Sequence, residues 1–107
     1  MGADGWIAGL VNAMPEESVR LFNLAIAERT ASDARTAREA TDALYRWFLP
    51  LLRLDTVPTF VQLIKLVQAE TNTGSELVRA PRLALDGECR AAALATIRRA
   101  IAGRPNL

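Results

Sequence analysis

The sequence predicts a mostly α-helical chain that begins with one short strand and continues with four helices. The strand is predicted from residues 5–11, Gly-Trp-Ile-Ala-Gly-Leu-Val, an uncharged run typical of a strand covered on both faces. The helices are predicted from apolar residues at three- and four-residue intervals, bounded by proline, glycine and capping residues. No other stretch has the pattern of a strand, so this strand would need a pairing partner from outside the 107 residues.

The first helix is predicted over about residues 15–29. Pro15 suits the first helical turn, where its missing N–H costs nothing, and Glu16 and Glu17 complement the positive end of the helix dipole. The apolar face is expected to comprise Val19, Phe22, Leu24 and Ile26, with Leu21 and Ala25 beside them.

Three further helices are predicted over about residues 33–52, 59–71 and 87–102. Ser32 or Asp33 should cap the first of these, and Pro50 should kink or end it, because proline removes a helical hydrogen bond. Residues 77–83 should be extended, since residues before Pro81 avoid the helical region. The inward-facing residues are expected to be Ala37, Ala40, Leu44, Trp47, Phe48 and Leu51, then Phe60, Leu63, Ile64 and Val67, then Leu94, Ile97 and Ile101.

Composition excludes several function classes. Thirteen basic against twelve acidic residues give a net charge of +1, and the arginines are dispersed, which argues against a nucleic-acid partner. The absence of histidine excludes Ser/His/Asp and Cys/His catalysis, and no metal-ligand cluster is visible. The single cysteine, Cys89, favours a reducing cytoplasmic setting. The longest low-charge run falls short of the ~20 residues that span a bilayer, so no membrane partner is expected.

Two groups of residues resemble a known family. Residues 5–15, Gly-Trp-Ile-Ala-Gly-Leu-Val-Asn-Ala-Met-Pro, are similar to the final barrel strand of the dihydrodipicolinate synthase and N-acetylneuraminate lyase family. A later succession, Val57-Pro58, Ile64-Lys65, Gly74 and Val78-Arg79-Ala80-Pro81-Arg82, follows that family's C-terminal pattern in order.

This resemblance implies a class I, Schiff-base-forming lyase that acts on 2-oxo acids without a cofactor. Such enzymes are (β/α)8 TIM barrels with a C-terminal helical extension, usually homotetramers. Residues 1–31 would be the last β/α unit of the barrel and residues 32–107 the extension. The family's catalytic lysine and proton-shuttling tyrosine would lie upstream, and the chain would be roughly the last third of its parent, because a barrel needs at least ~200 residues.

The resemblance also indicates which residues could border the substrate. Ile7 and Gly9 are expected to line the substrate pocket, with Asn12 further towards the site. The sequence has Ala8-Gly9 where many relatives have serine followed by a branched residue. Lys65, the only lysine, matches the family's lysine beyond the barrel, and we expect it to serve a salt bridge or helix packing rather than catalysis.

Several alternatives stay open. Residues 45–56 and 61–66 are similar to the branch that deaminates 1-pyrroline-4-hydroxy-2-carboxylate in hydroxyproline catabolism, whose substrate is a cyclic imino acid. A 2-oxo-3-deoxy sugar acid dehydratase or aldolase of the same family is the nearest alternative. A free-standing, non-catalytic helical module whose strand pairs with a partner's sheet is the other. Arg79 and Arg82 are expected to tie the loop to acidic neighbours, with Glu76 as a candidate partner.

Overall fold

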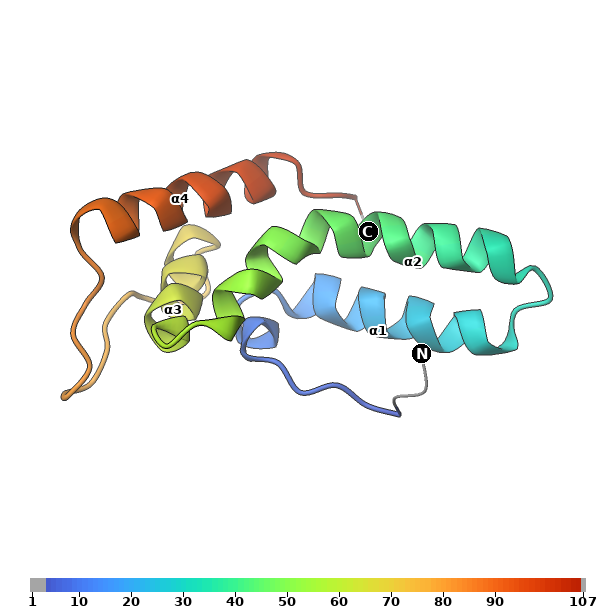
Figure 1. Cartoon of the computed structure of the whole chain (residues 1–107), viewed down its shortest axis with the longest axis horizontal. Helices are drawn as coiled ribbons and strands as arrows, with labels where there is room; N and C mark the ends of the chain where they lie inside the picture. Colours follow the sequence, from blue (N-terminus) through green and yellow to red (C-terminus); the bar gives the residue numbers. More distant parts are fainter. Residues whose placement is uncertain (1–3, 107) are drawn as a thin grey trace.

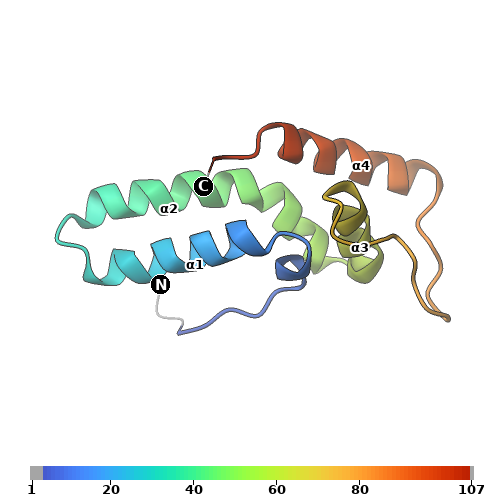
Figure 2. The same cartoon turned by 180° about the vertical axis from the view of Figure 1, so that it is seen from behind.

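The computed structural model describes residues 4–106, whose fold is built from helices alone (Figure 1). The α-helices and the two short 3-10 helices are η1 (Gly9–Asn12), α1 (Pro15–Thr30), α2 (Ala34–Leu52), η2 (Arg53–Thr56), α3 (Phe60–Glu70) and α4 (Gly87–Ala102). Helices α1 and α2 form an antiparallel hairpin along the 50 Å long axis, and α3 and α4 gather around the C-terminal end of α2 (Figures 1 and 2). The four predicted α-helices are thereby confirmed.

Local signals explain where the helices begin and end. Pro15 is the first residue of α1. Asp33 caps α2 by accepting a hydrogen bond from the backbone N–H of Thr36, at 3.2 Å. Helix α2 continues for two residues beyond Pro50 and then tightens into η2, so proline acts here near a helix end, where few hydrogen bonds are lost.

The predicted strand over residues 5–11 is wrong for the described residues. Residues 5–8 have no regular structure, and the chain then turns into η1. The reason is that residues 4–106 offer no second strand, so the backbone donors need another acceptor. The carboxylate of Asp55 supplies one: the Gly9 N–H donates to its Oδ2 at 2.6 Å.

The core lies where η1 and α1 meet the other three α-helices. Leu10 of η1 and Met14 are completely buried, and so are Phe48 and Leu51 of α2. The indole of Trp47 packs against this core and donates to the carbonyl oxygen of Ala100 at 2.9 Å. The expectation that Trp47 and Phe48 belong to the core of the helical part is therefore confirmed.

The inward face of α1 differs from the prediction. Leu21 is buried, and Leu24 and Ala25 are half-buried. Val19, Phe22 and Ile26, which were predicted to face inward, are 55%, 37% and 45% exposed. The sequence could not decide between these sets, because both fall at helical spacing and are equally apolar.

The helices of the structure agree with the prediction of a mostly α chain. That the chain derives from a TIM barrel, and that it divides between residues 31 and 32, stay predictions. Among residues 4–106, no helix is both long enough and apolar enough to cross a membrane.

Candidate functional site

A hollow of about 240 Å³ lies between η1 and α3. Phe60, Val61 and Ile64 give it an apolar wall. The polar side of the hollow comes from Gly9, Asn12, Lys65 and Gln68. The hollow therefore combines apolar surface with amide groups and one ammonium group, which is the make-up typical of small-molecule sites.

Hydrogen bonds hold the η1 side of the hollow in place. The Asn12 side-chain amide donates to the carbonyl oxygen of Gly9 at 3.0 Å, and the Gln68 amide donates to the carbonyl oxygen of Asn12 at 3.1 Å. A Cβ atom at Gly9 would lie 2.5 Å from Oδ1 of Asp55, so a side chain there would have to displace that carboxylate. The wall is thus formed before any ligand arrives.

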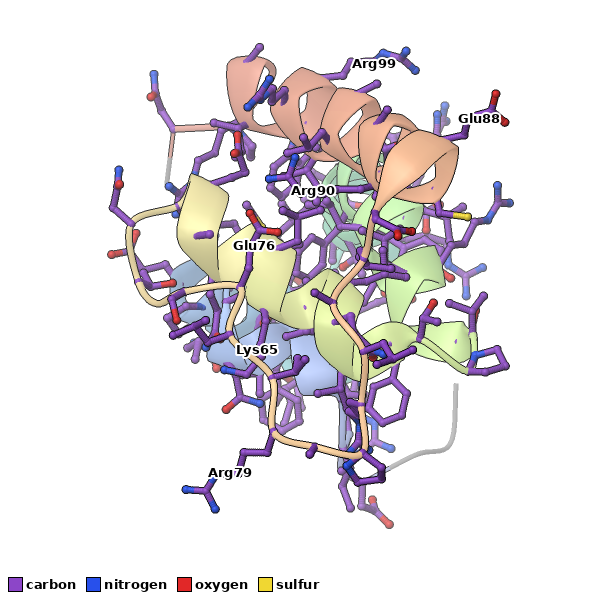
Figure 3. The ribbon with its side chains drawn as sticks, turned by 90° about the vertical axis from the view of Figure 1, so that its left-hand side faces the viewer. Lys65, Glu76, Arg79, Glu88, Arg90 and Arg99 are labelled. Atoms are coloured by element: carbon purple, nitrogen blue, oxygen red, sulfur yellow. The ribbon has the colours of Figure 1, made fainter. Side chains whose placement is uncertain are left out.

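Lys65 lies on α3, on the side of the molecule away from α4 (Figure 3). Its side chain is half-buried, one turn after Val61 and three residues before Gln68. No carboxylate of residues 4–106 lies within ion-pair distance of its ammonium group. The expected salt bridge is therefore not formed within the described residues, and what remains of that expectation is packing against the α3 surface.

The two residues predicted to line a substrate pocket lie in different surroundings. Gly9 lines the hollow, whereas the side chain of Ile7 is fully exposed and does not contribute to it. Asn12, which was expected further along, also lines the hollow. That a substrate binds against Ile7 and Gly9 stays a prediction.

Sequence reasoning missed the α3 contribution to this hollow. Phe60 was assigned to the core, but it is 40% exposed and forms part of the wall. Gln68 had no role. The signal that could have found them is their spacing, because residues 60, 61, 64, 65 and 68 follow one face of a helix.

The loop between α3 and α4 carries the arginines that were expected to pair with Glu76. Glu76 instead accepts two hydrogen bonds from Arg90 of α4, at 3.0 and 2.6 Å (Figure 3). These hydrogen bonds lower the pKa of Glu76 below its usual value. Arg79 and Arg82 have no ion pair within residues 4–106, and Arg79 points away from the helical body (Figure 3). The prediction that Glu76 pairs with Arg79 or Arg82 is therefore wrong.

One carboxylate is completely buried. Glu17, in the first turn of α1, is 0% exposed and accepts a hydrogen bond from Nε of Arg104, which follows α4. That hydrogen bond raises the pKa of Arg104. The second oxygen of Glu17, Oε2, has no hydrogen-bond partner among the described residues. The pair joins the start of α1 to the end of α4.

Metal ligands and the single cysteine are the remaining candidate groups. Within residues 4–106 no three potential ligands converge as a metal site would require. Cys89 is exposed near the start of α4.

No protein-family model, curated protein or solved structure matches this chain.

Proposed function

We propose that this chain is the C-terminal part of a class I, Schiff-base-forming lyase, acting on a 2-oxo acid or a cyclic imino acid. The proposal rests on the resemblance of residues 5–15 and 57–82 to the dihydrodipicolinate synthase and N-acetylneuraminate lyase family. In that role the chain supplies the last β/α unit and the helical extension, while the catalytic lysine belongs to the preceding barrel. The best candidate reaction is deamination of 1-pyrroline-4-hydroxy-2-carboxylate.

The observation that carries the proposal is an uncovered apolar surface at the start of the chain. Ile7 is 102% exposed, Trp6 is 41% exposed, and Val19, Phe22 and Ile26 form an exposed stripe along α1. Contiguous apolar surface of this kind is typical of a face that another body covers. A barrel preceding residue 4 would pair the backbone of residues 5–8 and cover this stripe of α1.

The test is to trap the imine in two proteins, namely this chain alone and this chain together with its upstream extension. The frame upstream of Met1 is translated together with residues 1–107, and both proteins are treated with pyruvate and borohydride. We expect a stable adduct on an upstream lysine in the extended protein and an unchanged mass in the 107-residue chain. An upstream frame without a barrel, or a ribosome-binding site directly before Met1, would favour the free-standing helical module instead.

The reaction itself is decided by product assays on the extended protein. Ammonia release from the pyrroline carboxylate would identify the deaminase. Turnover of a 2-oxo-3-deoxy sugar acid would identify the dehydratase or aldolase. A borohydride-stable adduct on Lys65 would contradict the proposal, because it would place the imine chemistry within the helical extension.

A further inference from the structure

We propose that the hollow between η1 and α3 is a binding site for a small monocarboxylate with a short apolar body, held by the ammonium group of Lys65. The inference concerns reversible, non-covalent binding to residues of this chain. It does not depend on the lyase assignment, which places imine chemistry on a lysine elsewhere.

The hydrogen-bond donors that line the hollow favour an anionic ligand. The amide of Asn12 is engaged by the carbonyl oxygen of Gly9, and the amide of Gln68 by that of Asn12. The Gly9 N–H is engaged by Asp55. The Asn12 and Gln68 amides each keep a second N–H, but the ammonium group of Lys65 is the only charged donor that lines the hollow, and no carboxylate among residues 4–106 neutralises its charge.

The lining selects the class of anion. Lysine presents a compact point charge, which suits a carboxylate or a phosphate. Lys65 is the only cationic residue that lines the hollow. A nucleotide or a polyphosphate calls for several cations or a nest of backbone N–H groups, and neither lines this hollow. Phe60, Val61 and Ile64 instead offer apolar surface to the rest of the ligand.

The size of the hollow limits the ligand. Its volume of about 240 Å³ lies below the range of about 300–1,000 Å³ that is typical of sites for drug-sized molecules. A carboxylate with a branched chain of a few carbons fits this volume. Because the η1 wall is already held by Asp55 and Gln68, binding costs little ordering of the protein.

Lys65 is the only lysine, so amine labelling reports on this site directly. The 107-residue chain is treated briefly with an acetylating reagent, alone or with 4-methylpentanoate, and acetylation of Lys65 is quantified by peptide mass mapping. The neutral amide of the same acid serves as the matched ligand control. We expect saturating carboxylate to slow acetylation of Lys65 by about tenfold, while the amide has little effect.

Two variants separate the site from general anion binding. Phe60→Ser removes apolar wall and should abolish the protection, whereas Leu77→Ser, at an exposed residue of the α3–α4 loop, should preserve it. Equal protection by the acid and its amide, undiminished protection in Phe60→Ser, or no protection by the acid would each overturn the proposal. The wild-type labelling decides alone if a variant fails to fold. Trapping on an upstream lysine and protection of Lys65 are separate readouts, so either proposal can fail without the other.

Discussion

The free faces of α1 and α2 differ, although the two helices pack against each other along the same hairpin. The exposed face of α2 is charged and includes Arg35, Arg38, Glu39, Asp42 and Arg46. The exposed face of α1 carries the apolar stripe Val19, Phe22 and Ile26. The charged face of α2 is suited to contact with water. The apolar stripe of α1 is typical of a helix that has other parts of a protein packed against two of its sides.

The buried side of α1 sharpens the contrast. It contains the carboxylate of Glu17 at 0% exposure, with Ser18 beside it. A helix that buries a charge while exposing valine, phenylalanine and isoleucine is not arranged for a two-layer protein in water. The arrangement becomes reasonable if Arg104 compensates the charge and a further body covers the stripe.

The first test removes the partner of the buried Glu17 carboxylate. Arg104→Met should leave Glu17 buried without its partner and lower the free energy of unfolding by about 3 kcal/mol, at the low end for broken buried pairs because Arg104 is half-exposed. Urea denaturation measures this change. The matched control is Arg99→Met, which removes an arginine of α4 that forms no ion pair within the described residues.

The double variant Glu17→Gln/Arg104→Met distinguishes charge from packing. It removes both charges and should recover much of the lost stability. If Arg104→Met is as stable as Arg99→Met, Glu17 is not a buried charge that depends on Arg104, and the contrast between the two sides of α1 loses its strongest element.

Leu10 and Ile7 provide the second test, because they are three residues apart and differ fully in exposure. Leu10→Ala should lower the free energy of unfolding by about 2–5 kcal/mol, since Leu10 is completely buried. Ile7→Ala should change it by less than about 0.5 kcal/mol in this chain, because Ile7 is fully exposed.

The same Ile7 substitution should behave differently in the extended protein. If a barrel covers Ile7, the cost rises to about 2–5 kcal/mol, and the milder Ile7→Val costs only about 0.5–1.5 kcal/mol. If Ile7 also borders the substrate pocket, Ile7→Val should lower kcat/KM more than its stability loss explains. Equal, small effects of Ile7→Ala in both proteins would contradict coverage of this residue.

The helices could be predicted because their signals lie within a few neighbouring residues. The other features depend on contacts between residues that are far apart in the sequence. The final helix was predicted over residues 87–102 and is found there, with Asp86 at its N-cap and Gly103 at its C-cap, although the Asp86 side chain forms no capping hydrogen bond. The strand prediction was wrong because an uncharged run signals burial but cannot provide the neighbouring strand. The partner of Glu76 was also wrong, since choosing Arg90 over Arg79 requires knowing that α4 returns past the α3–α4 loop.

Only the η1 side of the candidate site could be predicted from the sequence. Gly9 and Asn12 were singled out from the motif at the start of the chain, and both line the hollow. Phe60 and Gln68 share one face of a helix with Lys65, which spacing indicates, but nothing in the sequence shows that this face of α3 packs against η1. Lys65 was expected to serve a salt bridge or helix packing, and the described residues bring no carboxylate to it.

The third prediction tests whether the α1 stripe is an association surface. We expect the isolated chain to form oligomers in size-exclusion chromatography, because the stripe and residues 5–8 are uncovered. Val19→Lys/Phe22→Lys/Ile26→Lys should shift the population to monomer and weaken association by at least about tenfold, equivalent to about 1.4 kcal/mol. Arg46→Glu on the α2 face is the control and should leave the elution unchanged, because Arg46 is exposed and forms no ion pair within the described residues. A cooperatively folding monomer in the wild type would remove the reason to regard the two free faces as different.

The smallest expected effect concerns the ion pairs on the side of α4. Arg98 donates hydrogen bonds to Glu70, and Arg90 to Glu76, and each lowers the pKa of its carboxyl group below the ordinary 4.5. A lowered folded-state pKa stabilises the fold above pH 4.5, and this stabilisation is lost as the pH falls through the lowered value. Each pair is exposed to solvent, so its contribution to stability should be small. The free energy of unfolding of Glu70→Gln/Glu76→Gln should therefore lie below that of the wild type at pH 7, and the difference should narrow as the pH drops below 4.5. Added salt should reduce the difference at pH 7, because screening weakens exposed pairs. A difference that stays constant with pH would mean that these glutamates act through packing, and that the charged side of the molecule is no more dependent on electrostatics than the apolar side.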